Sequence, residues 1–134
     1  TGELLPVKDT PFDFNKRKRI GQDLEADHIQ LKNAFGYDHS FVLNGTENQL
    51  TLEEPVSGRR LIISTTAPVV QVYTGNFLKD GCIGKAGRVY ENREGVALET
   101  QLMPNAINTE ENPSTILRKG DKFESNTKYV FEIM

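Results

Sequence analysis

The sequence predicts an all-β fold, arranged as an antiparallel β-sandwich, and three observations support this prediction. Six short segments are rich in β-branched or aromatic residues or alternate apolar with polar residues, as half-buried strands do. Only one stretch has the spacing of a helix, and it is weak. Glycine, proline and asparagine separate the segments, as in sandwiches. A chain of 134 residues has the size of one domain.

Residues 1–35 are expected to form loops, with one short helix around residues 23–33. The basic run at residues 16–19 fits either a localisation or nucleic-acid patch or a solvated loop among acidic neighbours. The acidic sequence pI of about 5.4 favours the solvated loop.

Six segments are expected as strands: residues 40–43, 49–54, 59–65, 69–74, 96–100 and 128–133. The first two flank residues 44–48, which begin with Asn-Gly, the strongest short hairpin signal. We therefore expect these two strands to pair with each other. Asn44-Gly45-Thr46 also matches a glycosylation acceptor, but a chain with one cysteine favours the turn.

Two long loops, residues 75–95 and 102–114, flank the strand expected at residues 96–100. Long loops in a small domain are often functional. Their strand carries Glu99 in an otherwise apolar run, so this carboxylate must face solvent or lie in a cleft with partners. The arrangement is typical of a ligand cleft on a β-sandwich.

Charge and hydropathy exclude several classes of partner. The 16 basic and 19 acidic residues give a net charge of −3, so the chain lacks the positive field of a nucleic-acid binder. No apolar run approaches the ~20 residues of a membrane span. We therefore expect no nucleic-acid partner and no membrane association.

The cysteine and histidine content limits the chemistry of the chain. Cys82 is the only cysteine, which excludes an internal disulfide and a multi-cysteine zinc site and indicates a cytoplasmic location. Its glycine-rich surroundings contain no nearby histidine, so nothing there supports nucleophilic catalysis. His28, expected in a surface loop, and His39 are too few for a metal site, and none is expected. His39 and its neighbour Asp38 should point to opposite faces of their strand.

Three polar residues on strand-like segments, Asp38, Gln71 and Glu99, are candidates for binding a polyhydroxylated ligand. Taken singly, each would more often be a solvent-facing strand residue. Together they offer carboxylate and amide groups that bind sugar hydroxyls through directional hydrogen bonds. Aromatic residues near them could supply an apolar face for a sugar ring: Tyr37, Tyr73 or Phe77.

The strings around these residues resemble a known family, the aldose 1-epimerases or galactose mutarotases. The resemblance is carried by residues 36–43 (GYDHSFVL), 70–78 (VQVYTGNFL), 98–101 (LETQ) and 104–106 (PNA), with support from residues 10–14, 20–21 and 117–120. These segments occur in the family's order and spacing across essentially all 134 residues.

The resemblance implies a large antiparallel β-sandwich, the galactose mutarotase-like supersandwich, and an isomerase that needs no cofactor. Such enzymes interconvert the α and β anomers of free aldohexoses such as galactose or glucose. By resemblance, Glu99 is the general base that takes the proton from the anomeric hydroxyl, while a histidine acid protonates the ring oxygen. Asp38 and Gln71 are expected to contact the sugar. We expect Glu99 to be partly buried and without a tight cation partner, so that it can accept a proton near neutrality.

The resemblance also implies that residues 1–134 are the C-terminal part of a single mutarotase-like sandwich domain. The family's acid histidine, its second active-site histidine and its substrate-binding arginine belong to the N-terminal part, and neither His28 nor His39 matches them. We therefore expect this chain to be inactive alone and to have that N-terminal part as a partner. The alternative is a non-catalytic sugar-binding or sugar-sensing relative, against which the presence of Glu99 argues.

Overall fold

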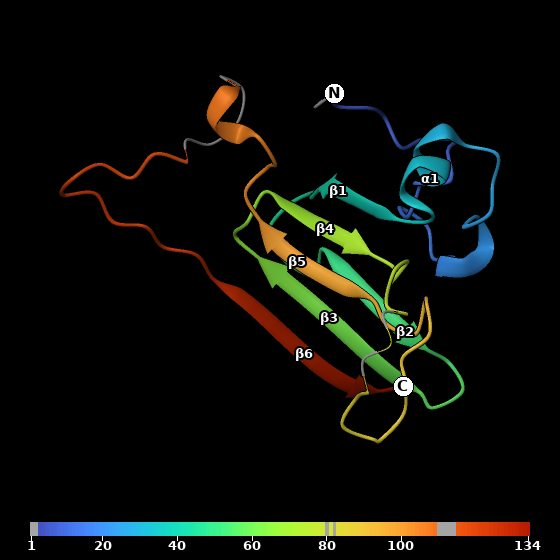
Figure 1. Cartoon of the computed structure of the whole chain (residues 1–134). Coiled ribbons are helices and arrows are strands. Elements are labelled where there is room, and N and C mark those ends of the chain that lie inside the picture. The colour runs from blue at the N-terminus through green and yellow to red at the C-terminus, as the bar shows by residue number, and fades with distance from the viewer. Residues whose placement is uncertain (1–2, 80, 82, 110–114) are drawn as a thin grey trace. The chain divides into compact units, whose positions relative to one another are not determined.

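The computed structural model describes residues 3–79, 81, 83–109 and 115–134. All six expected strands are found, with ends that differ from the prediction by at most two residues (Figure 1): β1 (Asp38–Val42), β2 (Leu50–Glu54), β3 (Arg59–Thr65), β4 (Val69–Tyr73), β5 (Ala97–Gln101) and β6 (Thr127–Ile133). The helices are short: α1 (Ile29–Ala34) and the 3₁₀ turns η1 (Ile20–Gln22) and η2 (Ala106–Asn108).

The strands form two three-stranded sheets, in the orders β1-β4-β5 and β2-β3-β6. This confirms the all-β prediction. The chain divides into two compact units. The first contains Thr1–His39 and Val72–Leu98, and the second contains Ser40–Gln71 and Glu99–Met134. Among the described helices, none is long and apolar enough to span a membrane.

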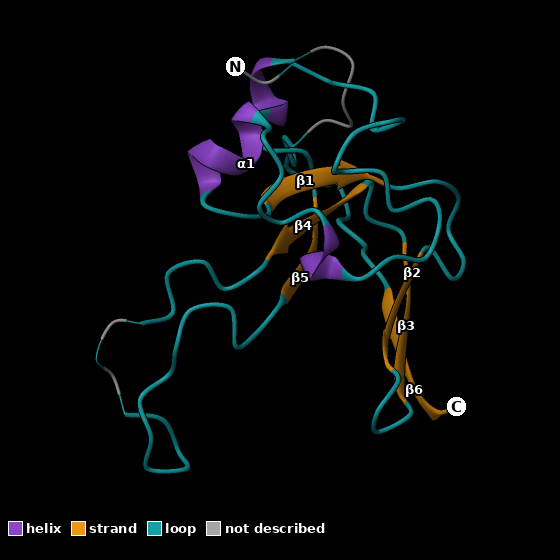
Figure 2. Ribbon diagram, turned by 90° about the vertical axis from the view of Figure 1, so that its right-hand side faces the viewer, coloured by secondary structure: helices purple, strands orange, loops and turns teal. Residues whose placement is uncertain are grey.

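The β2-β3-β6 sheet of the second unit is antiparallel, with β3 in the centre. Figure 1 and Figure 2 both show its three strands side by side. Side chains alternate along each strand, so Ile63 turns to the interior, where only 1% of it is exposed. On the opposite face, Arg60 lies between Glu53 and Glu132 of the neighbouring strands, at 2.8 and 3.4 Å. Each such surface ion pair contributes less than about 1 kcal/mol.

A short connection, here called the corner, joins the central strands of the two sheets. β3 ends in three buried residues and β4 begins with two, and only three residues lie between them. Pro68 has no N–H to extend the β3 ladder. The Thr65 hydroxyl accepts a hydrogen bond from the Ala67 N–H at 3.1 Å, which satisfies a backbone donor inside the corner. The Pro68 carbonyl then accepts from the Leu43 N–H at 3.0 Å and begins the β1–β4 pairing.

The expected hairpin between the first two strands is wrong, because β1 and β2 belong to different sheets. β2 pairs with β3 through the turn at residues 55–58. The Gln49 side chain directs this pairing: its amide donates to the Thr65 carbonyl at 3.0 Å and accepts from the Thr65 N–H at 2.8 Å. Gly45 does adopt the positive φ of a turn, 73°. The turn signal was correct, whereas the identity of the partner strand was not.

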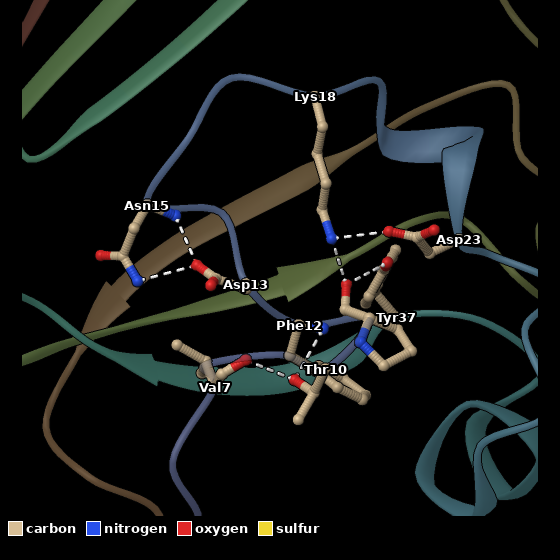
Figure 3. Close-up of polar contacts among 9 residues, drawn as sticks. Val7, Thr10, Phe12, Asp13, Asn15, Lys18, Asp23 and Tyr37 are labelled. Atoms are coloured by element: carbon tan, nitrogen blue, oxygen red, sulfur yellow. Dashed lines mark hydrogen bonds and ion pairs between the residues drawn. The ribbon is translucent and has the colours of Figure 1, made fainter.

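In the first unit, one backbone carbonyl accepts hydrogen bonds from two side chains (Figure 3). The Pro11 carbonyl accepts from Lys18 Nζ at 2.6 Å and from the Tyr37 hydroxyl at 2.7 Å. Lys18 also pairs with Asp23 at 2.8 Å and lies over the ring of Phe14. Its side chain is only 11% exposed. The prediction of a solvated basic run is therefore wrong for Lys18, although the other three basic residues of the run are exposed.

The expected helix is found as α1 but begins later and is short. His28 is its N-cap, and the Nδ1 atom accepts a hydrogen bond from the Gln30 N–H at 3.3 Å. The helix ends at Phe35, whose φ of 57° is left-handed. Gly36 follows with a φ of 139°, and a Cβ there would lie 2.4 Å from Oδ1 of Asn76. Both constraints require glycine at this position.

Replacing Tyr37 by phenylalanine tests the carbonyl junction at Pro11. Tyr37 is fully buried, and burial, followed by the charge of Asp23, raises the pKa of its hydroxyl to about 12, so that it remains a donor. We expect Tyr37→Phe to lower the free energy of unfolding by about 1 kcal/mol, measured by urea titration. The matched control, Tyr129→Phe, alters a half-exposed hydroxyl and should change it by less than about 0.5 kcal/mol. Equal losses in the two variants would contradict the structural role of the junction.

Candidate functional site

Glu99 stands at the centre of β5, an outer strand of its sheet. Its side chain is exposed, whereas its neighbours Leu98 and Thr100 are half-buried. The expectation of partial burial is therefore wrong for this chain. The alternation of the strand directs Glu99 to the face opposite to that of Leu98 and Thr100. Among the ion pairs of the described residues, none involves Glu99, so its carboxylate is accessible to a ligand.

Gln71 stands at the centre of β4 and is half-buried. Its Oε1 atom accepts a hydrogen bond from the hydroxyl of Ser40, at 2.5 Å. Ser40 is the central residue of β1, the strand beside β4. The first two residues of β4 are buried, which holds the backbone that carries Gln71. The amide of Gln71 is thus anchored both through its strand and through its own oxygen.

Asp38 is the first residue of β1 and is exposed. Its backbone N–H donates to Nδ1 of His39 at 3.0 Å. The side chain of His39 is half-buried, with its ring centroid 4.7 Å from that of Phe12. The two neighbours thus differ in exposure as the alternation of a strand predicts, and Asp38 remains accessible to a ligand.

The two histidines of the chain lie against one phenylalanine. The ring of Phe12, 9% exposed, packs on His39 and also on His28, with centroids 5.2 Å apart in the second pair. The expectation that His28 is a surface loop residue is wrong, because it is half-buried and caps α1. Burial lowers the pKa of His39; the charge of His28 lowers it further, while Asp38 raises it.

The three candidate residues lie on three strands of the β1-β4-β5 sheet: Asp38 on β1, Gln71 on β4 and Glu99 on β5. Within the second unit, Gln71 and Glu99 are on neighbouring strands. A carboxylate accepts hydrogen bonds and protons, and an amide both donates and accepts, so these groups can bind hydroxyls and exchange protons. Ser40 was not singled out from the sequence, where nothing indicates which strand faces it.

A metal centre finds no support in the part of the chain that the structure describes, since it holds no group of three or more histidine, cysteine, aspartate or glutamate side chains suited to a metal ion. Cys82, whose sequence surroundings do not support nucleophilic catalysis, lies outside the described residues.

Comparison with known proteins places these residues in a wider context. A family model described as Aldose 1-epimerase matches residues 1–130. Galactose mutarotase of Homo sapiens is 38% identical over 136 residues, which cover 99% of this chain and 38% of that protein. Aldose 1-epimerase of Escherichia coli (strain K12) is 35% identical over 134 residues, which cover 96% of this chain and 38% of that protein.

Solved structures of similarly named proteins also match this chain. A GalM/aldose epimerase homologue from C. elegans superposes with a TM-score of 0.84 at 30% sequence identity, covering 99% of this chain and 40% of that one. Galactose 1-epimerase from Lactobacillus acidophilus NCFM gives a TM-score of 0.66 at 28% identity, over 96% of this chain and 37% of that one. The chain therefore spans about two fifths of the length of the relatives it matches.

The burial of His39 has a measurable consequence. We expect a pKa below the ordinary value of 6.5, measured by NMR titration of the imidazole, and a return toward 6.5 in Phe12→Ala, which uncovers the ring. As the pH falls through 6.5, His39 is protonated in the unfolded chain but still neutral in the folded chain. The contribution of neutral His39 to the free energy of unfolding is therefore complete above pH 6.5 and is lost as the pH falls.

The matched measurement compares the free energy of unfolding of His39→Gln across the same pH range. This variant should lack the decrease at acid pH that is due to His39. A pKa of His39 at or above 6.5 in the unmodified protein would show that the contact with Phe12 does not desolvate the imidazole.

Proposed function

The chain belongs to the aldose 1-epimerase family, and we propose that it supplies the general base and sugar contacts of an enzyme that interconverts the α and β anomers of free aldohexoses such as galactose or glucose. The observation that carries this proposal is the accessible carboxylate of Glu99 in the middle of β5, in a chain whose relatives are named as aldose 1-epimerases and galactose mutarotases. The side chain of Glu99 points away from the half-buried Leu98 and Thr100, on the face where a ligand can reach it.

In the proposed reaction, Glu99 takes the proton from the anomeric hydroxyl while an acid protonates the ring oxygen, and the bond between the anomeric carbon and the ring oxygen breaks. The open-chain aldehyde rotates about its first carbon–carbon bond. Reversal of both proton transfers closes the ring as the other anomer. Protons are only exchanged and the oxidation state of the sugar is unchanged, so the proposal includes no cofactor.

Asp38 and Gln71 are proposed as sugar contacts. An exposed carboxylate such as that of Asp38 accepts hydrogen bonds from sugar hydroxyls. The amide of Gln71 can donate to a hydroxyl oxygen and is already held at its own oxygen by Ser40. Both groups are of the kind that fixes the orientation of a ligand in a sugar site.

The acid is proposed to be a histidine from a part of the enzyme outside this chain, the N-terminal part. Two observations support such a partner. The chain spans only 38% of the curated relatives. In addition, Tyr129, Phe131 and Ile133, here called the β6 stripe, lie on one face of an outer strand and are 49%, 78% and 75% exposed. Burying such side chains contributes about 1.5–3 kcal/mol each. We refer to the chain with this N-terminal part as the assembly.

The same proposal includes a cytoplasmic location, supported by the single cysteine of the chain, and no nucleic-acid partner, supported by its net charge of −3.

Glu99→Gln in the assembly tests the chemistry. Glutamine keeps the shape of the side chain but cannot take up the proton, so mutarotation of galactose followed by polarimetry should slow by about 10²- to 10⁴-fold. Galactose should still bind, as measured by calorimetry. The control, Glu132→Gln, changes another strand glutamate that is accessible to solvent and should leave the rate unchanged. A near-normal rate in Glu99→Gln would refute the proposed base, and sugar binding without turnover in the unmodified assembly would favour a sugar-binding relative.

Phe131→Lys tests the partner. A charged residue in the middle of the β6 stripe should weaken association of the chain with the N-terminal part by about tenfold or more, measured by native mass spectrometry of titrated mixtures. Val56→Lys is the control, because Val56 is 94% exposed in the turn between β2 and β3. Equal association of the two variants would exclude the β6 stripe as the contact.

A further inference from the structure

Ser40 and Gln71 face each other across two neighbouring strands of the second unit. The Leu43 N–H donates to the Pro68 carbonyl at 3.0 Å, which sets the antiparallel pairing at one end of β1 and β4. Three residues back along β1 is Ser40, and three residues forward along β4 is Gln71. Residues directly opposite in such a pair have Cβ atoms about 5 Å apart, within reach of a direct side-chain contact. The hydrogen bond of 2.5 Å between the Ser40 hydroxyl and Oε1 of Gln71 is that contact.

The hydrogen bond selects one orientation of the Gln71 amide. The last torsion of a glutamine side chain is broad and roughly two-fold, so by itself it leaves the oxygen and nitrogen free to exchange places. A serine hydroxyl can donate to an amide oxygen or accept from an amide nitrogen, and in the structure the Ser40 hydroxyl donates to Oε1. With Oε1 turned toward Ser40, the Nε2 atom and its N–H donors lie on the other branch of the amide.

We propose that Ser40 is a positioning residue: it holds the amide of Gln71 so that Nε2 donates to a hydroxyl oxygen of the bound aldose. This inference rests on the proposed function, because it assumes that Gln71 contacts the sugar. Ser40 itself acts only through Gln71. A fixed amide loses less conformational freedom when the sugar binds, which favours binding of the ring form and its open-chain form alike.

The kinetic test is Ser40→Ala in the assembly. Loss of one positioning hydrogen bond should raise the KM for galactose by about 3- to 10-fold and leave kcat within about twofold, because uniform binding is lost rather than catalysis. Ser40→Thr restores the hydroxyl and should restore KM. Ser40→Cys keeps the size of the side chain with a weaker donor, and its KM should fall between those of serine and alanine.

The control for a merely structural effect is Ser64→Ala. Ser64 is also a serine of a strand in the second unit, and its hydroxyl accepts from the Asn48 N–H at 2.9 Å rather than contacting Gln71. We expect this variant to leave the KM for galactose unchanged at 25 °C. A KM increase as large as that of Ser40→Ala would overturn the positioning role.

A double-mutant cycle with Gln71→Ala separates the inference from the proposed function. If Ser40 acts through Gln71, the double variant should have the KM of Gln71→Ala alone, because the second change has nothing left to position. If the KM increases of the two single variants instead multiply in the double variant, the role of Ser40 is overturned while Gln71 remains a sugar contact. A fall in kcat for Ser40→Ala at unchanged KM would have the same meaning. No effect of Gln71→Ala would instead remove the proposed contact and the inference with it, while the result for Glu99→Gln would still decide the reaction.

Discussion

The arrangement of the sheets depends on the corner between β3 and β4. The two strands that occupy the centres of the two sheets are consecutive in the sequence, and only three residues connect them. The carbonyl of Pro68 opens the hydrogen-bonded ladder between β1 and β4 by accepting from the Leu43 N–H. The buried side chains Ile63, Val69 and Val70 lie close to this corner in the sequence and anchor both central strands.

The strands were predictable because alternation of apolar and polar residues is a local property of the sequence, whereas the choice of partner strand is not. The Asn-Gly of residues 44–45 indicated a turn, and Gly45 has the corresponding positive φ. Nothing in those residues indicates that Gln49 pairs through its side chain with Thr65, 16 residues away. Lys18 was placed in solvent for the same reason, because its acceptor is a backbone carbonyl that the sequence pattern does not reveal.

For the candidate site, the sequence resemblance suggested residue types and positions, and the structure adds how firmly each is held. Gln71 lies on a central strand and is bonded to Ser40, so its geometry is determined by this chain. Glu99 lies on an outer strand with an exposed side chain, and its expected burial was wrong. If Glu99 is the base proposed above, an exposed carboxylate of this kind acquires its catalytic surroundings only when further groups approach it. The two side chains therefore differ in how far this chain alone determines their geometry.

The pairing of β3 with β6 also bears on how the chain folds during synthesis. Thr65 and Thr127, which face each other in this ladder, are 62 residues apart in the sequence. At ribosomal rates of about 5–20 residues per second, β3 therefore leaves the ribosome about 3–12 seconds before its partner strand exists. During that interval one edge of β3 has its backbone donors and acceptors unpaired, beside apolar side chains such as Leu61. The open edge of nascent β3 is therefore available for pairing with other strands until β6 has been synthesised.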